Sequence, residues 1–143
     1  MRDQSHSVAI EAFTYDIDFA GHVSNISYIR WLEVARVRLL EAAGLPLATM
    51  VAHGFAPFLT RTDIKYRRPV ALGQLVEVRY GVGELRSLSA RVDFRLVCED
   101  QLVAEASQWN ILVNLATGRP HRLSREHAKL FDTLRWDGVG GEE

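Results

Sequence analysis

The sequence predicts an α+β fold in which a curled antiparallel sheet wraps around one long central helix. Three observations indicate it: a helical period over residues 25–43, a period of two over most of residues 58–115, and short turns between the alternating segments. Consecutive strands joined by short turns pair antiparallel. Because the helix carries apolar residues on most of its circumference, we expect the sheet to curl around it.

The long helix is predicted to begin at Asn25 and to end at Ala43, because Gly44 and Pro46 are strong stop signals. Its apolar side is expected to carry Ile29, Leu32, Leu39, Leu40 and Ala43. Alternating residues predict a first strand over 8–14, and residues 47–53 form a short second helix that ends at Gly54.

Four further strands are predicted over residues 58–67, 74–83, 88–98 and 102–115. The alternation is cleanest in the third of these, where one side carries Leu88, Ala90, Val92, Phe94, Leu96 and Cys98. Ser124 is expected to cap a short last helix. Residues 1–137 are therefore expected to form a single domain, followed by a flexible tail over 138–143.

Composition narrows the function classes. The chain has 143 residues and a net charge of −1, which gives no electrostatic footprint for nucleic acid or for an anionic membrane. Its single cysteine, Cys98, is compatible with a reducing compartment, and its phase in the strand favours a small buried hydrophobe over a nucleophile. The N-terminal residues lack the apolar core of a signal peptide, and Gly and Pro break the uncharged stretch 42–60. We expect a cytoplasmic protein.

The loop before the long helix concentrates polar and turn-forming residues between a strand and a helix start. It carries two carboxylates, a glycine, a histidine and an asparagine: Asp16, Asp18, Gly21, His22 and Asn25. The N–H groups at a helix N-terminus are unpaired, and the helix dipole favours negative charge there. The segment is therefore a candidate site for stabilising a developing oxyanion.

The pattern of this loop and helix continues into a second segment. It consists of Tyr15, Asp16, Asp18, Gly21, His22, Val23, Ser24, Asn25, Tyr28, Glu33 and Arg36, followed by Tyr66-Arg67-Arg68-Pro69-Val70 and Gly73. This set resembles the hotdog-fold acyl-CoA thioesterases, specifically the 4-hydroxybenzoyl-CoA thioesterase-like family, and the similarity covers almost the whole chain. Ser24 is the departure, because many members carry asparagine at that position.

The resemblance implies that Asp18 is the catalytic carboxylate. An aspartate is ionised at neutral pH without a partner base, and it can attack a thioester carbonyl or activate a water that does so. The sequence leaves both roles open, and without the family pattern a turn-capping role would be favoured. Asp16, two residues away, is interpreted as structural. Glu33, whose equivalent is the acid in a sister hotdog group, is the weaker candidate and is expected to pair with Arg36.

For each neighbouring residue, the resemblance implies a role in catalysis, and a simpler structural role is the alternative. In the family a backbone N–H near Asn25 points at the thioester oxygen, while its side chain is equally suited to cap the helix. Gly21 allows close approach of the backbone to a ligand, or is simply a turn glycine. His22 is either a polar neighbour of the thioester or a histidine bonded to local backbone. The five histidines show no metal-ligand spacing, and we expect no metal or other cofactor.

Substrate contacts are expected from Tyr28, Arg67, Arg68, Arg86 and Ser87. Coenzyme A carries phosphates that basic residues can bind, and by resemblance the turn at Arg86 and Ser87 is where family members often contact the nucleotide. A solvated basic surface is the alternative for each arginine.

The implied function is hydrolysis of an aromatic or fatty acyl-CoA to a free acid and coenzyme A. A catalytically silent acyl-CoA-binding protein and a thioesterase acting on acyl carrier protein are the alternatives, and a hotdog hydratase is a weaker one. Family members assemble as homodimers, often as dimers of dimers (a homotetramer), with a continuous sheet and the site at the subunit interface. An unpaired edge strand would fit such a partner.

Overall fold

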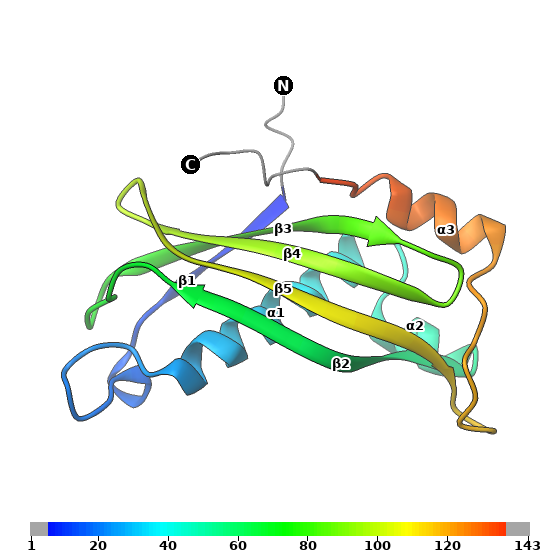
Figure 1. Ribbon diagram of the computed structural model, residues 1–143, viewed down its shortest axis with the longest axis horizontal. Helices are drawn as coiled ribbons and strands as arrows, with labels where there is room; N and C mark the ends of the chain where they lie inside the picture. Colours follow the sequence, from blue (N-terminus) through cyan, green and yellow to red (C-terminus); the bar gives the residue numbers. More distant parts are fainter. Residues whose placement is uncertain (1–5, 137–143) are drawn as a thin grey trace.

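A computed structural model describes residues 6–136 of the chain. Its elements are β1 (His6–Glu11), the 3₁₀ turn η1 (Thr14–Asp16), α1 (Asn25–Ala42), α2 (Leu47–Ala52), β2 (Phe55–Tyr66), β3 (Leu75–Leu85), β4 (Ser89–Cys98), β5 (Gln101–Asn114) and α3 (Arg125–Asp132). The strands form one antiparallel sheet in the order β1-β3-β4-β5-β2, which curves over α1 (Figure 1). The predicted fold class is confirmed, and the predicted tail lies outside the described residues.

The core forms between α1 and the concave face of the sheet. In β4 the alternation holds as predicted, since Val92, Phe94, Leu96 and Cys98 are all buried. Burial raises the pKa of the Cys98 thiol, as expected for a cysteine that packs as a hydrophobe. On the helix, Leu32 and Leu39 are no more than 2% exposed.

Several predicted boundaries were wrong by a few residues. The first strand begins at His6 and ends at Glu11, because the chain turns into η1, where the Asp16 N–H donates to the Phe13 carbonyl. The second begins at Phe55, which pairs with Asn114 at the far end of β5. The remaining strands and helices match within two residues.

The apolar side predicted for α1 needs one correction. Ile29 is 41% exposed, whereas Tyr28, Trp31, Leu32 and Ala35 are buried. Apolar residues surround much of this helix, so its sequence period alone could not fix which side faces the sheet. The chain does not wrap the helix on most sides: Ile26, Ile29 and Val34 lie on an outward face.

The two edges of the sheet differ. On one side β3 pairs with β1 and then, at Val82, with residue Arg135, so both halves of its edge are covered. On the other side the twelve residues of β2 pair only with β5 within the described chain. Phe58 and Leu59 on β2 are 51% and 41% exposed. A long edge strand that is free on one side within the described residues is a template for pairing with another chain.

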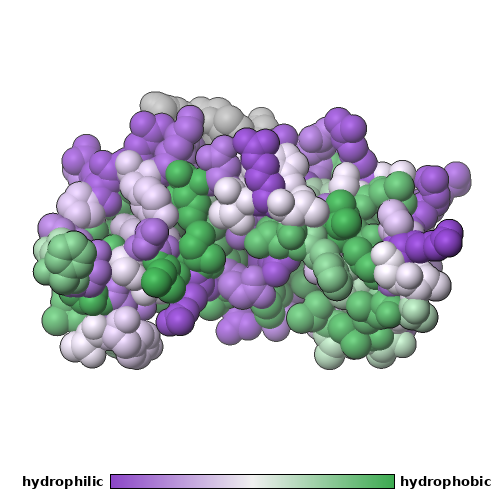
Figure 2. All heavy atoms as spheres, turned by 60° about the horizontal axis from the view of Figure 1, so that its bottom comes forward, coloured by the Kyte–Doolittle hydropathy of each residue, from purple (hydrophilic) through white to green (hydrophobic). Residues whose placement is uncertain are grey.

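Figure 2 shows the side of the molecule along which β2 runs, with apolar side chains toward both ends and a more polar middle. Near the N-terminus of α1 the exposed apolar residues are Phe13, Tyr15, Phe19 and Ile26, and near α2 they are Leu47, Val51 and Phe58. These two sets are called the loop patch and the α2 patch below. None of the helices within residues 6–136 has the length and apolarity to cross a membrane.

Candidate active site

Asp18 lies on a tight loop that is closed by backbone hydrogen bonds. Ile17 and Val23 form an antiparallel bridge, and the Asp18 N–H donates to the His22 carbonyl at 2.9 Å. One carboxylate oxygen of Asp18 accepts from the Ala20 N–H at 2.9 Å, and the side chain is exposed. Gly21 has a φ of +84°, a conformation that a residue with a Cβ adopts at a cost. The loop therefore presents the Asp18 carboxylate outward in a defined place.

The buried side chain of Asp16 holds the same loop in place through hydrogen bonds. Its side chain is 4% exposed and accepts hydrogen bonds from the Phe13 N–H at 2.9 Å and from the Ser27 hydroxyl at 2.7 Å. Its carbonyl accepts from the Ser24 N–H. The first bond closes η1, and the bonds from Ser27 and Ser24 join η1 to the start of α1, which agrees with the interpretation of Asp16 as structural. Ser27 was not singled out from the sequence, because a contact over eleven residues leaves no local pattern.

Ser24, the residue that departs from the family pattern, caps α1. Its hydroxyl oxygen accepts from the Ser27 N–H at 3.3 Å. The alternative in which the Asn25 side chain caps the helix was therefore wrong. Asn25 is the first helical residue and is exposed, and its N–H and that of Ile26 have no carbonyl to donate to within the helix. Two free N–H groups at the positive end of α1 can thus bind an oxyanion.

Residues 66–70, the second segment of the family pattern, lie against the Asp18 loop. The Val23 N–H donates to the Val70 carbonyl at 2.9 Å, and the N–H groups of Arg67 and Arg68 both donate to the Val103 carbonyl. The Arg67 guanidinium pairs with Glu105 on β5, so its charge is compensated. Arg68 is exposed beside it. Of the residues predicted to contact phosphate, Arg67 and Arg68 lie at the same end of the sheet as Asp18.

Tyr28 faces the core rather than an open pocket. It is 4% exposed and meets the rings of Trp31 and Tyr66 edge to face, at 5.4 and 5.0 Å between centroids. Desolvation, with smaller contributions from Tyr66 and Cys98, raises the pKa of its hydroxyl to about 12. The hydroxyl is therefore neutral over the physiological range. Its predicted role as a direct substrate contact has no open access within this chain.

Arg86 and Ser87 lie at the opposite end of the sheet. They form the β3–β4 turn after Leu85, whereas the Asp18 loop follows Glu11, which pairs with Leu75 at the start of β3. Ten residues of strand separate the two ends, about 33 Å. Arg86 pairs with Glu84 at 2.7 Å, which lowers the pKa of that carboxyl, and both side chains are accessible. One chain alone does not bring these residues to Asp18.

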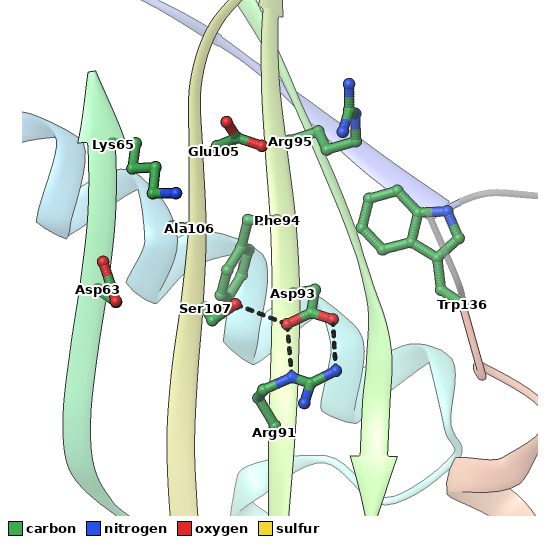
Figure 3. A pocket seen from close by; sticks show the side chains of 10 residues that line it. All are labelled: Asp63, Lys65, Arg91, Asp93, Phe94, Arg95, Glu105, Ala106, Ser107 and Trp136. Atoms are coloured by element: carbon green, nitrogen blue, oxygen red, sulfur yellow. Dashed lines mark hydrogen bonds and ion pairs between the residues drawn. The ribbon is translucent and has the colours of Figure 1, made fainter. Parts of the chain in front are cut away.

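The convex face of the sheet carries a separate cavity of about 320 Å³. Figure 3 shows it on the side of the strands away from α1, with the Arg91 guanidinium bonded to Asp93 and the Ser107 hydroxyl donating to the same carboxylate. A Cβ at Gly83 would collide with Asp93, so glycine makes room for this pair. The pair compensates its own charges on the far face of the sheet, and we do not assign the active site there.

No group of three His, Cys, Asp or Glu side chains within residues 6–136 is arranged to hold a metal ion. His22 is exposed, and its carbonyl accepts the hydrogen bond from the Asp18 N–H.

Gln108 and Asn110, which are 1% and 5% exposed on the concave face, were not singled out from the sequence. The signal was present, since both interrupt an alternating apolar strand in phase with Ala104 and Ala106.

Comparisons with known proteins agree with this geometry. A family model described as "Thioesterase-like superfamily" matches residues 13–131. The chain is 31% identical over 114 residues to the long-chain acyl-CoA thioesterase FadM of Escherichia coli, covering 78% of this chain and 86% of FadM. It is 25% identical over 91 residues to the putative esterase sll0410 of Synechocystis, covering 64% of this chain but only 55% of that relative.

Solved structures share the fold. The DHNA-CoA thioesterase of Staphylococcus aureus superposes with a TM-score of 0.85 at 22% identity, covering 97% of this chain and 96% of that one. The strand order and the long helix α1 under the sheet thus agree with the predicted hotdog fold. The chain belongs to the thioesterase-like superfamily and is a thioester hydrolase of the hotdog fold.

Proposed function

We propose that the protein hydrolyses an acyl-CoA thioester to a free carboxylic acid and coenzyme A, with Asp18 as the catalytic carboxylate. The observation that carries the proposal is the exposed Asp18 carboxylate on a loop tied, through Asp16 and Ser27, to the free N-terminus of α1. A nucleophile or base and an oxyanion-binding helix end are thereby held together.

Two routes fit this arrangement. In one, a carboxylate oxygen of Asp18 bonds to the thioester carbon, the carbon–sulfur bond breaks, and coenzyme A leaves as a thiolate that takes a proton from solvent. Water then hydrolyses the resulting anhydride. In the other, Asp18 takes a proton from a water that attacks the same carbon, the carbon–sulfur bond breaks, and the Asp18 carboxyl returns the proton to the leaving thiolate of coenzyme A. In both, negative charge develops on the carbonyl oxygen, where the N–H groups of Asn25 and Ile26 stabilise it.

A second copy of the chain supplies the nucleotide contacts in this proposal. Antiparallel pairing of β2 with the β2 of a twofold-related copy continues the sheet and buries Phe58 and Leu59. It also sets the loop patch of one copy against the α2 patch of the other. Such a dimer would bring the partner's β3–β4 turn, with its Arg86 and Ser87, closer to Asp18 than the 33 Å or so along β3 within one chain. Dimers of dimers extend the same assembly.

The acyl group is the open part of the substrate. Similar proteins include a long-chain acyl-CoA thioesterase and a DHNA-CoA thioesterase, so both fatty and aromatic acids belong in the test. A thioester on acyl carrier protein is the second candidate. The buried thiol of Cys98, the single cysteine, supports a reducing compartment, and we propose the cytoplasm.

The test is release of coenzyme A from a panel of aromatic and fatty acyl-CoAs by the wild-type protein and by Asp18→Asn. We expect turnover on at least one substrate and a loss of about 10²–10⁴-fold in kcat with the substitution. Asp16→Glu is unsuitable as a control because Asp16 is buried, whereas Asp132→Asn changes an exposed carboxylate on α3, away from the proposed dimer edge, and should keep full activity. Turnover that survives Asp18→Asn would remove the catalytic assignment, and binding without turnover would favour the silent acyl-CoA binder.

A further inference from the structure

A second cavity on the convex face of the sheet, of about 290 Å³, lies beside the β3–β4 turn. Its lining includes Thr60, Glu84, Arg86, Ser89, Arg91 and Trp109. It is distinct from the cavity in Figure 3, although Arg91 borders both. Small-molecule sites in proteins have volumes from about 300 Å³ upward, so the cavity matches the smallest of them.

The strand register defines the floor of this cavity. Glu84 on β3 pairs with Arg91 on β4, and Arg91 pairs with Trp109 on β5. Trp109 alternates along β5 with the buried Gln108 and Asn110, so this row of side chains points away from α1. Paired residues of antiparallel strands have Cα atoms about 4.5–5.5 Å apart. The side chains of Arg91 and Trp109 are therefore direct neighbours.

Two bulges flank this row. The β2–β5 register shifts at the extra residue Thr60, and the β3–β4 register shifts at the extra residue Gly83. The Thr60 hydroxyl donates to the Trp109 carbonyl at 3.1 Å, which fixes the first bulge against β5. Bulges bend a strand locally and are over-represented next to functional sites.

Trp109 is a large aromatic side chain in a row of charged ones, and a cation lies against it. The Arg61 guanidinium on β2 is 4.4 Å from the centre of the indole ring. Arg61 does not line the cavity, whose lining apart from Thr60 comes from β3, β4, β5 and the turn. One side of the indole is thus covered, and the side toward β4 borders the cavity. An indole held in this way is a stacking surface for a planar base.

Arginine side chains lie at the turn, at the edge of the cavity. Arg86 donates through Nε to Glu84 at 2.8 Å, and none of the bonds made by the described residues uses its Nη1. The Leu123 N–H donates to the Ser87 carbonyl at 2.7 Å, which brings Arg122 to the same turn. Arg122 is exposed and forms no ion pair within residues 6–136. Guanidinium groups with free donors of this kind bind phosphate.

We propose that this cavity binds the adenine nucleotide of the acyl-CoA substrate, with the base stacked on Trp109 and a phosphate bound by Arg86 and Arg122. The inference rests on the proposed function and adds Trp109 and Arg122, which the family pattern did not single out. The base covers the side of the indole opposite to Arg61. Stacking is tolerant of the base, so Trp109 supplies affinity, and the arginines supply the preference for a phosphorylated ligand.

The test uses probes without a thioester, so it does not depend on turnover. Calorimetry compares adenosine 3′,5′-bisphosphate, the nucleotide of coenzyme A, with inorganic pyrophosphate. Trp109→Leu should weaken binding of the bisphosphate by about tenfold, as expected for the loss of one base–aromatic stack, and leave pyrophosphate binding unchanged. Trp109→Tyr keeps an aromatic ring and should retain most of the affinity. Trp136→Leu, the same change beside the other convex cavity, should bind like the wild type.

Equal affinity of the wild type and Trp109→Leu for the bisphosphate, at an unchanged melting temperature, would overturn the site. If Trp109→Leu does not fold, indole fluorescence of the wild type and Trp109→Tyr decides instead. The bisphosphate should quench the wild-type emission, and equal quenching in Trp109→Tyr would come from Trp31 or Trp136 and would overturn the site.

A last comparison distinguishes coenzyme A from a separate nucleotide. Adenosine 3′,5′-bisphosphate should inhibit acyl-CoA hydrolysis competitively. Binding at Trp109 without competition would assign the cavity to another nucleotide and overturn the proposal. If no acyl-CoA is hydrolysed, the proposed function fails, and calorimetry of an acyl-CoA with the wild type and Trp109→Leu decides the cavity by the same expected difference.

Discussion

The two ends of the sheet are built differently. At the N-terminus of α1, the Asp18 loop is held by backbone bonds and by the buried Asp16 and Ser27 pair. At the β3–β4 turn, the exposed guanidinium of Arg86 pairs with the accessible carboxylate of Glu84. A reacting carboxylate must be fixed in position, whereas a phosphate contact needs charge and reach. Under the proposed function, one chain therefore carries two dissimilar parts of the site, about 33 Å apart along β3.

The largest effect is expected from a substitution that loosens the Asp18 loop. Ser27→Ala removes the hydroxyl that donates to the buried Asp16 carboxylate, and a buried acceptor left unpaired costs about 1–3 kcal/mol. We expect a loss of that size in the free energy of unfolding, measured by urea denaturation, and a lower kcat because the Asp18 loop loosens.

Ser87→Ala is the matched change at the other end, since Ser87 is exposed and it is its carbonyl that accepts a bond, from Leu123. It should change stability by less than about 0.5 kcal/mol. An equal loss in the free energy of unfolding for Ser27→Ala and Ser87→Ala would contradict the account that the Asp18 loop is held rigidly and the β3–β4 turn is not.

An intermediate effect, on substrate binding, is expected from a substitution in the β3–β4 turn. Arg86→Ala should raise KM for an acyl-CoA by about tenfold, the value of one charge-assisted bond to phosphate, and leave kcat unchanged. The N-acetylcysteamine thioester of the same acid lacks the nucleotide and should show no change. Arg38→Ala, at another exposed arginine that pairs with a glutamate, Glu41 on α1, serves as the control. A fall in kcat alone with Arg86→Ala would show that the turn acts on the chemistry instead.

The smallest effect concerns the helix cap beside Asp18. Ser24→Ala removes the hydroxyl that accepts from the Ser27 N–H and should cost about 1 kcal/mol, observed as a lower melting temperature. Ser24→Asn installs the residue common in the family and should be close to neutral, because asparagine and serine cap helices equally well. A larger loss with asparagine than with alanine would mean that Ser24 does more than cap the helix.

Local patterns were sufficient for the elements and for the family segment. The alternation of β4 and the Ser124 cap appear as predicted and the end of α1 before Gly44 is within one residue of the prediction, because each depends on neighbouring residues. Ile29 was misplaced because a helix with apolar residues on most sides has no unique inward face. The Asn25 side chain was wrongly considered as the cap because asparagine is a favoured cap residue, whereas the structure uses the preceding Ser24.

Contacts between distant residues could not be predicted from one sequence. The Asp16–Ser27 bond and the Arg36–Asn110 bond span 11 and 74 residues and depend on how α1 lies under the sheet. The separation of Arg86 from Asp18 follows from the strand order, in which β3 runs its full length between them. Strand order is a tertiary property, so the family pattern named the residues of the site without showing that one chain holds them apart.

The central claim is that Asp18 of one subunit works with Arg86 of another, and subunit mixing tests it most directly. Asp18→Asn and Arg86→Ala proteins are each assayed alone at a substrate concentration below KM, then unfolded together, refolded and assayed again. In a twofold dimer, half of the randomly formed dimers are mixed, and each mixed dimer has one site with neither substitution. The account predicts recovery to about a quarter of wild-type activity. Activity that stays at the mean of the two variants would contradict it.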